Sequence, residues 1–254
     1  MTDHIKIDLT DRIMTITIAR PERKNALTQA MYGKMADAIN GANTDKSVRA
    51  IIITGEGDMF TAGNDLTDFA SKEDRDGGTP PVTRFLHAIL SAEKPLIAAV
   101  NGPAVGVGLT MLLHCDIAYA GETANLRAPF TQLGLVPEAG SSLVLPRIVG
   151  RSMANDILLA GRILTAQEAL ECGLVSRVLP DNELYGAAMA TAQKIAASAP
   201  SAIAKTKALV NDRRDEIAEQ MQAEGKIFAA QLQSPEFREA AAAFAEKRAP
   251  VFED

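Results

Sequence analysis

Two glycine-containing segments of the sequence could present free backbone N–H groups to a ligand. They read Phe60-Thr-Ala-Gly-Asn-Asp-Leu-Thr-Asp-Phe69 and Asn101-Gly-Pro-Ala-Val-Gly-Val-Gly-Leu-Thr110. Glycine allows close approach of the backbone to a ligand, and a helix start leaves amide donors without partners. Two such donors that meet at one point would form an oxyanion hole, which stabilises negative charge on a carbonyl oxygen. The alternative for each segment is an ordinary glycine turn.

A single carboxylate stands in a third, largely apolar segment, Phe130-Thr-Gln-Leu-Gly-Leu-Val-Pro-Glu-Ala-Gly-Ser-Ser142. Glu138 is the only charged residue between Arg127 and Arg147. Apolar surroundings raise the pKa of a carboxyl group, which suits it to accept and return protons near neutral pH. The segment therefore indicates a general base. The alternative is a solvated glutamate in a loop.

Other patterns that could carry chemistry fail on inspection. Gly106-Val-Gly108 hints at dinucleotide binding, but Met111 stands where the third glycine belongs. The segment 150–154 is one residue short of a nucleophile elbow and follows no predicted strand. The three histidines lack metal-ligand spacing. Neighbouring side chains point apart in His114-Cys115-Asp116, so we predict neither a metal site nor a nucleophile there.

The elements that must position these residues follow from hydrophobic patterning. Short apolar or alternating runs predict strands at 5–9, 13–18, 48–54, 95–100 and 116–120. A helix is predicted from Thr28 to Ala42, with Thr28 as its N-cap. Alternation of helices and buried strands favours an α/β core with parallel pairing over 1–180. From 181 to 254 the pattern is almost entirely helical, which predicts a separate helical region.

Composition limits the possible partners. The 254 residues carry a formal net charge of −6 without a basic stripe, so we expect no nucleic-acid partner. The stretch 95–113 is uncharged and about as long as a membrane span. Asn101-Gly-Pro103 interrupts it, which favours strand, turn and helix start over a span. With two cysteines and no secretory signal, we expect reduced thiols in a cytoplasmic protein without a membrane partner.

Taken in order, several segments resemble the crotonase (enoyl-CoA hydratase/isomerase) family over residues 1 to about 250. The resemblance implies an α/β fold with a β-β-α superhelix core and a C-terminal helical region that forms trimers, or hexamers of two trimers. It also implies acyl-CoA thioester substrates, so that coenzyme A is part of the substrate and no separate cofactor is needed. The segments that carry it are 60–65, Lys94-Pro-Leu-Ile-Ala-Ala-Val-Asn-Gly-Pro103, Cys115-Asp-Ile-Ala118, Leu133-Gly-Leu-Val-Pro137 and 165–175.

The resemblance also implies a set of site residues. The backbone N–H groups of Asn64 and Val107 would form the oxyanion hole, and Glu138 would be the catalytic acid–base. Coenzyme A would lie along 20–27 and 61–66, with Arg23 and Lys24 as candidates for phosphate contacts or, alternatively, as solvated charges. Asp65 is expected to cap the next helix rather than to touch substrate. The substrate-binding residues implied are Lys24, Ala26, Thr61, Ala62, Gly63, Asn64, Asp65, Leu66, Gly106 and Phe130.

Two departures from the family pattern indicate which reaction the chain performs. Hydratases of the family carry two glutamates, and here those positions correspond to Thr110 and Phe130. The setting of Glu138, Val-Pro-Glu-Ala-Gly-Ser-Ser, resembles isomerases that move a double bond from C3 to C2. Hydration needs one group to activate water and another to deliver a proton, whereas isomerisation needs one base. We therefore expect isomerisation of 3-enoyl-CoA to 2-enoyl-CoA in acyl-CoA degradation; the alternatives are hydration, other crotonase chemistry or a silent acyl-CoA-binding homologue.

Overall fold

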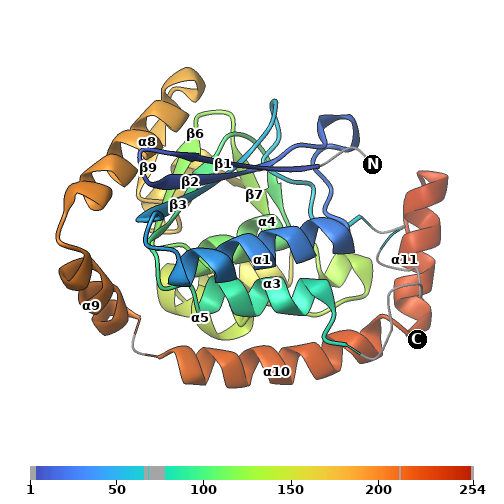
Figure 1. The fold of residues 1–254 in the computed structure, drawn as a ribbon. Helices are drawn as coiled ribbons and strands as arrows, with labels where there is room; N and C mark the ends of the chain where they lie inside the picture. The colour runs from blue at the N-terminus through green and yellow to red at the C-terminus, as the bar shows by residue number, and fades with distance from the viewer. Residues whose placement is uncertain (1–3, 66–67, 69–77, 212, 253–254) are drawn as a thin grey trace.

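The computed structural model describes residues 4–65, 68, 78–211 and 213–252, and its centre is a six-stranded sheet (Figure 1). The strand order is β1-β2-β3-β4-β6-β9. Only β1 and β2 pair antiparallel, as the predicted hairpin, and the other pairs are parallel. The strands are β1 (Ile5–Thr10), β2 (Ile13–Ile18), β3 (Ala50–Gly55), β4 (Leu96–Val100), β6 (Ile117–Gly121) and β9 (Arg177–Leu179).

The apolar runs form strands because both faces of the sheet are covered by helices. Side chains alternate between the two faces of a strand. In β3, Ile51 and Ile53 join the main hydrophobic core with the helices that precede residue 180, whereas Ile52 packs with residues of helix α8. A strand buried on both sides reads as a continuous apolar run, which explains the pattern at 50–54.

A smaller, three-stranded sheet lies beside the first, with the order β5-β7-β8. The helices before residue 180 fill the space around the two sheets, and α1 packs closely against α3. The remaining elements of this part are α1 (Gln29–Thr44), α3 (Pro81–Leu90), β5 (Ala104–Val105), α4 (Val107–Thr110), β7 (Asn125–Arg127), α5 (Ser141–Val149), α6 (Arg151–Leu158), β8 (Leu164–Thr165) and α7 (Ala166–Glu171), with short 3-10 helices η1 (Pro21–Arg23), η2 (Met111–His114) and η3 (Thr131–Leu133).

The C-terminal helices form an arm that curves around the core, from α8 past α9 and α10 to α11 (Figure 1). Their bounds are α8 (Asp181–Ala197), α9 (Pro200–Val210), α10 (Arg214–Gln231) and α11 (Pro235–Glu246). Helix α9 is anchored by Lys207, whose Nζ donates to the Lys94 carbonyl at 2.8 Å and to Asp116 at 2.6 Å. The mixed α/β core followed by a helical region is therefore confirmed. The division at residue 180 stays a prediction, since α8 packs on the sheet.

Local sequence signals set several helix starts. The Thr28 hydroxyl accepts from the Met31 amide at 3.3 Å and caps α1 as predicted. A capping box at α7 joins Thr165 and Glu168 in both directions. Ser234 caps α11 at the Phe237 amide. The uncharged stretch 95–113 forms strands β4 and β5, helix α4 and part of η2.

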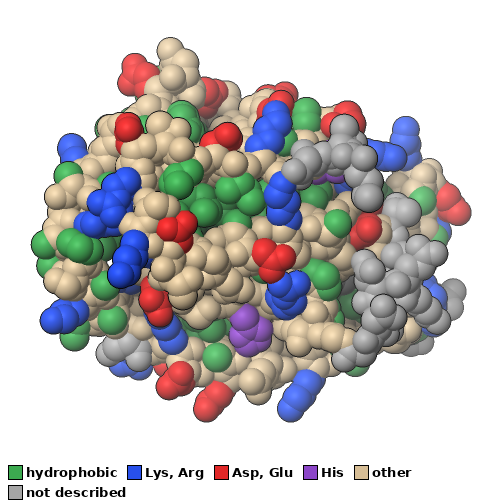
Figure 2. All heavy atoms as spheres, in the orientation of Figure 1, with side chains coloured by type: hydrophobic (Ala, Val, Ile, Leu, Met, Phe, Trp, Pro, Cys, Tyr) green, Lys and Arg blue, Asp and Glu red, His purple; other side chains and the backbone are tan. Residues whose placement is uncertain are grey.

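Figure 2 shows acidic and basic side chains interspersed over one face, with hydrophobic side chains gathered over β1 and β2, where Ile7 and Leu9 are exposed. None of the helices in the described ranges is both long and apolar enough to cross a bilayer. Within the same ranges, no group of three or more His, Cys, Asp or Glu side chains is arranged to hold a metal ion. Cys115 and Cys172 are free, partly buried thiols.

Candidate active site

The two glycine-containing loops lie side by side. Thr61 pairs with Ala104 in a parallel β-bridge, where the Thr61 amide donates to the Pro103 carbonyl at 3.1 Å. The Val105 amide returns a bond to the Thr61 carbonyl at 3.0 Å. Three residues further along each loop stand Asn64 and Val107. Neither N–H has an acceptor among the described residues, so two free donors are available on neighbouring segments.

Glycine is required where these loops approach each other. Gly63 has a φ of +87°, and a Cβ there would lie 2.8 Å from the Val105 carbonyl oxygen. Gly106, with a φ of +59°, turns the chain into helix α4 so that Val107 becomes its first residue. The first amides of a helix have no partner within the helix. Glycine at these positions lets the two loops pack closely, and their role in binding a ligand stays a prediction.

The side chain of Asn64 points into the protein. Its Oδ1 accepts a short hydrogen bond from the hydroxyl of Tyr32, which is fully buried and packs against Phe85 with ring centroids 5.4 Å apart. The Asn64 side chain thus holds its loop in place, and the predicted role of its backbone N–H stays a prediction. Tyr32 was not predicted, because in the sequence it is one more apolar position of α1.

The segment implied for coenzyme A lies directly against the first loop. The Ala62 amide donates to the Lys24 carbonyl at 3.0 Å, and the Leu27 amide donates to the Gly63 carbonyl at 2.8 Å. Lys24 is exposed, with a left-handed backbone at φ +52°. Arg23 is exposed as well. Lys24 is therefore placed beside the loop, with its side chain in solvent.

Asp65 and Arg20 tie these two segments together. Arg20 Nη1 donates to Asp65 Oδ2 at 2.7 Å and to the Ala26 carbonyl at 3.0 Å. Asp65 Oδ1 accepts from the Asp68 amide at 3.3 Å, which is the contact that a helix cap makes. Leu66, the next residue of the implied set, lies outside the described residues.

Glu138 occupies the segment between η3 and α5. Its side chain is only 7% exposed, and Oε1 has no hydrogen-bond partner within the described part of the chain. Burial, followed by the nearby charge of Glu224, raises the pKa of Glu138 to about 7. A carboxyl group with this pKa can both accept and donate a proton near neutral pH.

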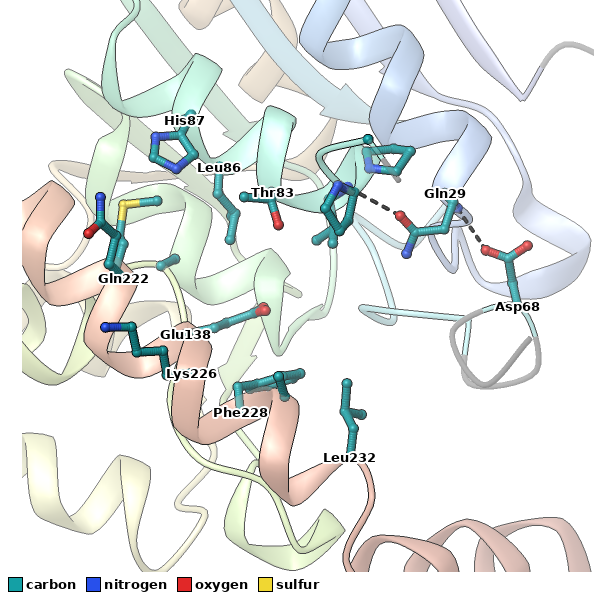
Figure 3. Close-up of a pocket in the computed structure, with 18 of the residues that line it drawn as sticks. Gln29, Asp68, Thr83, Leu86, His87, Glu138, Gln222, Lys226, Phe228 and Leu232 are labelled. Carbon is teal, nitrogen blue, oxygen red and sulfur yellow. Dashed lines mark hydrogen bonds between the residues drawn. The ribbon is translucent and has the colours of Figure 1, made fainter. Parts of the chain in front are cut away.

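Glu138 lines a cavity of about 1020 Å³ between helices α3 and α10 (Figure 3). Apolar walls come from Leu86 of α3, Phe228 of α10 and Leu232, which directly follows α10. Gln29 and Lys226 are among the polar residues. Of the predicted site residues that the structure describes, only Glu138 lines this cavity.

Tyr32 interacts with the first glycine-containing loop and with Glu138. Burial raises the pKa of Tyr32, and the charge of Glu138 raises it further, so the Glu138 carboxyl acts electrostatically on the Tyr32 hydroxyl. The Tyr32 hydroxyl in turn bonds Asn64. Tyr32 therefore links the first glycine-containing loop, through its hydrogen bond to Asn64, with the electrostatic influence of Glu138.

Thr110 and Phe130 occupy buried positions and cannot exchange protons near neutral pH. The Thr110 hydroxyl has no hydrogen-bond partner in the described ranges. Phe130 is buried in the main core and is absent from the cavity wall. Its predicted contact with substrate stays a prediction.

The raised pKa of Glu138 predicts a stability difference that depends on pH. In the unfolded chain this carboxyl would ionise near an ordinary 4.5, but in the folded protein it ionises near about 7. Its contribution to folding is full below pH 4.5 and is lost as pH rises to 7, because the buried carboxylate is disfavoured. Glu138→Gln, which does not titrate, should therefore gain roughly 3 kcal/mol relative to wild type across this range. Urea unfolding at several pH values tests this; a constant difference would contradict it.

Comparison with known proteins places the chain in a family. Residues 8–254 match the profile described as enoyl-CoA hydratase/isomerase. A crystal structure of an enoyl-CoA hydratase/isomerase from Pseudoalteromonas atlantica T6c is 51% identical, covers 99% of this chain and 100% of that chain, and has a TM-score of 0.95. The 2,3-dehydroadipyl-CoA hydratase of Escherichia coli (strain K12) is 35% identical over 243 residues, 95% of each protein. The Enoyl-CoA delta isomerase 2 of Rattus norvegicus is 41% identical over 175 residues, 67% of this chain and 44% of the rat protein.

The matched region includes both glycine-containing loops and Glu138. The names of these relatives include hydratase and isomerase alike, and both reactions use acyl-CoA thioesters. The chain therefore belongs to the enoyl-CoA hydratase/isomerase (crotonase) family, and it is an enzyme of that family's acyl-CoA hydratase/isomerase chemistry.

Proposed function

We propose that the protein is an isomerase that converts 3-enoyl-CoA to 2-enoyl-CoA with Glu138 as its single acid–base. The observation that carries the proposal is the buried Glu138 carboxyl, with one oxygen unpartnered among the described residues and a pKa raised to about 7. Thr110 and Phe130 stand where hydratases of the family carry their two glutamates. One proton-transferring group suits a reaction that moves one proton within the substrate.

The proposed reaction begins when Glu138 removes a proton from C2 of the acyl chain. The electron pair moves onto the thioester oxygen, where the backbone N–H groups of Asn64 and Val107 stabilise the resulting enolate. Glu138 then returns a proton to C4, and the double bond comes to lie between C2 and C3. Each oxyanion donor typically contributes about 2.7–4 kcal/mol to such a step.

Apolar surroundings favour this reaction over hydration. Leu86 and Phe228 line the cavity beside Glu138, and Phe130 is buried where a second carboxylate would otherwise stand. Exclusion of water keeps the pKa of the base raised and protects the enolate. The second candidate function is hydration by Glu138 alone, which the name of the Escherichia coli relative favours.

The wider context of the reaction is part of the same proposal. Arg23 and Lys24 are exposed beside the Ala62–Gly63 backbone, which suits them to contact the phosphates of coenzyme A. Exposed apolar side chains on the C-terminal arm support assembly into a trimer or a hexamer of two trimers; they are Leu209, Val210 and Phe244. We place the enzyme in cytoplasmic fatty-acid degradation by β-oxidation.

Product analysis tests the reaction directly. Incubated separately with 3-enoyl-CoA and 2-enoyl-CoA, the enzyme should isomerise the first much faster than it hydrates the second. Glu138→Gln should retain acyl-CoA affinity but lose about 10²–10⁴-fold in isomerisation rate, because the amide cannot accept the C2 proton. Hydration as fast as isomerisation would favour the second candidate, and acyl-CoA binding without turnover of either substrate would indicate a silent homologue.

The oxyanion donors can be tested at Val107. Because Val107 is the first residue of α4, a proline fits the helix there but removes the N–H group. Val107→Pro should lower kcat by about 10²–10³-fold. Val107→Ala, the matched control, retains the N–H and should stay within a few-fold of wild type. Equal losses in the two folded variants would show that the side chain, not the donor, matters.

A further inference from the structure

We propose that Glu224, on helix α10, is a positioning residue that holds the Glu138 segment in place and keeps a second negative charge beside it. The proposal rests on the function proposed for Glu138. Through Glu224, the C-terminal arm would position the proposed base, which lies in the α/β core.

Glu224 is hydrogen-bonded to Gly140 and Ser142, which lie shortly after Glu138 in the chain. Its Oε2 accepts from the Gly140 amide at 2.6 Å, and its Oε1 accepts from the Ser142 amide at 2.9 Å and the Ser142 hydroxyl at 2.5 Å. Both amides lie at the start of α5, where helix N–H groups lack partners and favour negative charge. Glu224 is only 5% exposed. A buried carboxylate from another helix thus caps α5.

The segment between Glu138 and this cap is strained and must be held. Ala139 has a φ of +62°, a left-handed conformation that non-glycine residues rarely adopt. Its carbonyl accepts from Nε2 of His114, 2.7 Å away. Burial lowers the pKa of His114, which keeps the ring neutral. With His114 on one side and Glu224 on the other, the backbone that carries Glu138 is fixed at two adjacent residues.

Glu224 also acts on Glu138 through its charge. After burial, the Glu224 charge is the next cause of the raised pKa of Glu138. Burial raises the pKa of Glu224 as well, but its bonds to Ser142 and Gly140 oppose that shift by stabilising the carboxylate. The other titratable groups around this region are Tyr32 of α1, His114 of η2, and, on the cavity wall, His87 of α3, Lys226 of α10 and Asp68.

The same pair of helices provides a matched control. Glu216 also links α10 to α5, through two bonds to Arg147 at 2.6 and 3.0 Å. The Glu216–Arg147 pair lies at the surface, and the charge of Glu216 is not among the causes of the raised pKa of Glu138. Glu216→Gln loosens the α10–α5 contact without touching the Glu138 segment.

The test is a titration of the Glu138 carboxyl carbon by ¹³C NMR in wild type, Glu224→Gln and Glu216→Gln, with the signal assigned by its loss in Glu138→Gln. In Glu224→Gln the pKa of Glu138 should fall, because the like charge is gone. The acidic limb of the kcat/KM profile should move to lower pH with it. In Glu216→Gln the titration should match wild type.

Turnover adds a second readout. An amide at position 224 can accept from only one of the two backbone N–H groups, so Glu224→Gln should also lower kcat by roughly 10–100-fold through misplacement of the base. Glu224→Asp keeps the charge but shortens the reach. We expect it to retain a raised Glu138 pKa while lowering kcat, and it replaces Glu224→Gln should that variant not fold.

The proposal would be overturned if folded Glu224→Gln left the pKa of Glu138 unchanged. It would also be overturned if the pKa of Glu138 fell in Glu224→Asp, because that variant keeps the negative charge. The NMR titration needs no turnover, so it judges Glu224 even if Glu138 proves not to be the base. Wild-type turnover in Glu138→Gln would instead refute the proposed function.

Discussion

The central constraint on this molecule is the burial of the Glu138 carboxyl with an oxygen that bonds to nothing in the described part of the chain. A buried polar group without a partner costs free energy, and a buried charge costs more. In the folded protein the Glu138 carboxyl avoids the larger cost by staying protonated at pH values below its raised pKa of about 7. The burial that destabilises the folded state also gives Glu138 a pKa at which it can accept and donate a proton near neutral pH.

Elements from both parts of the chain surround Glu138 and the segments near it. In the α/β core the two glycine-containing loops lie side by side, and the Thr61–Ala104 bridge joins them. The C-terminal arm forms one wall of the cavity that Glu138 lines, since α10 supplies Phe228 to that wall, and the same helix supplies Glu224 to the start of α5. The arm therefore completes the cavity in which Glu138 lies.

Sequence reasoning succeeds here where the signal is local. Thr28 caps α1 as predicted, because a capping hydroxyl and the amide it accepts from are only three residues apart in the sequence. Continuous apolar runs likewise predict β3 and β4, because the pattern of a buried strand lies within a few consecutive residues. The bridge between Thr61 and Ala104 could not be predicted in this way, because it joins segments some forty residues apart.

The missed residues are those whose role depends on distant contacts. Glu224 stands in a polar helix and resembles any solvated glutamate until its contact with Gly140, 84 residues away, is known. Lys207 likewise resembles a surface lysine, but it is buried against Asp116. Tyr32 and the walls of the cavity escape prediction in the same way, because α3 and α10 meet only in the folded chain.

The central claim is that one carboxylate carries the proton from C2 to C4 in a site that excludes water. The most direct measurement follows the hydrogen itself: 3-enoyl-CoA with deuterium at both C2 positions is converted in a single turnover in ordinary water, and the product is analysed for label. The account predicts deuterium at C4 in a substantial fraction of the product, since Glu138 returns what it removed. A product whose C4 gains only solvent hydrogen from the first turnover would contradict it.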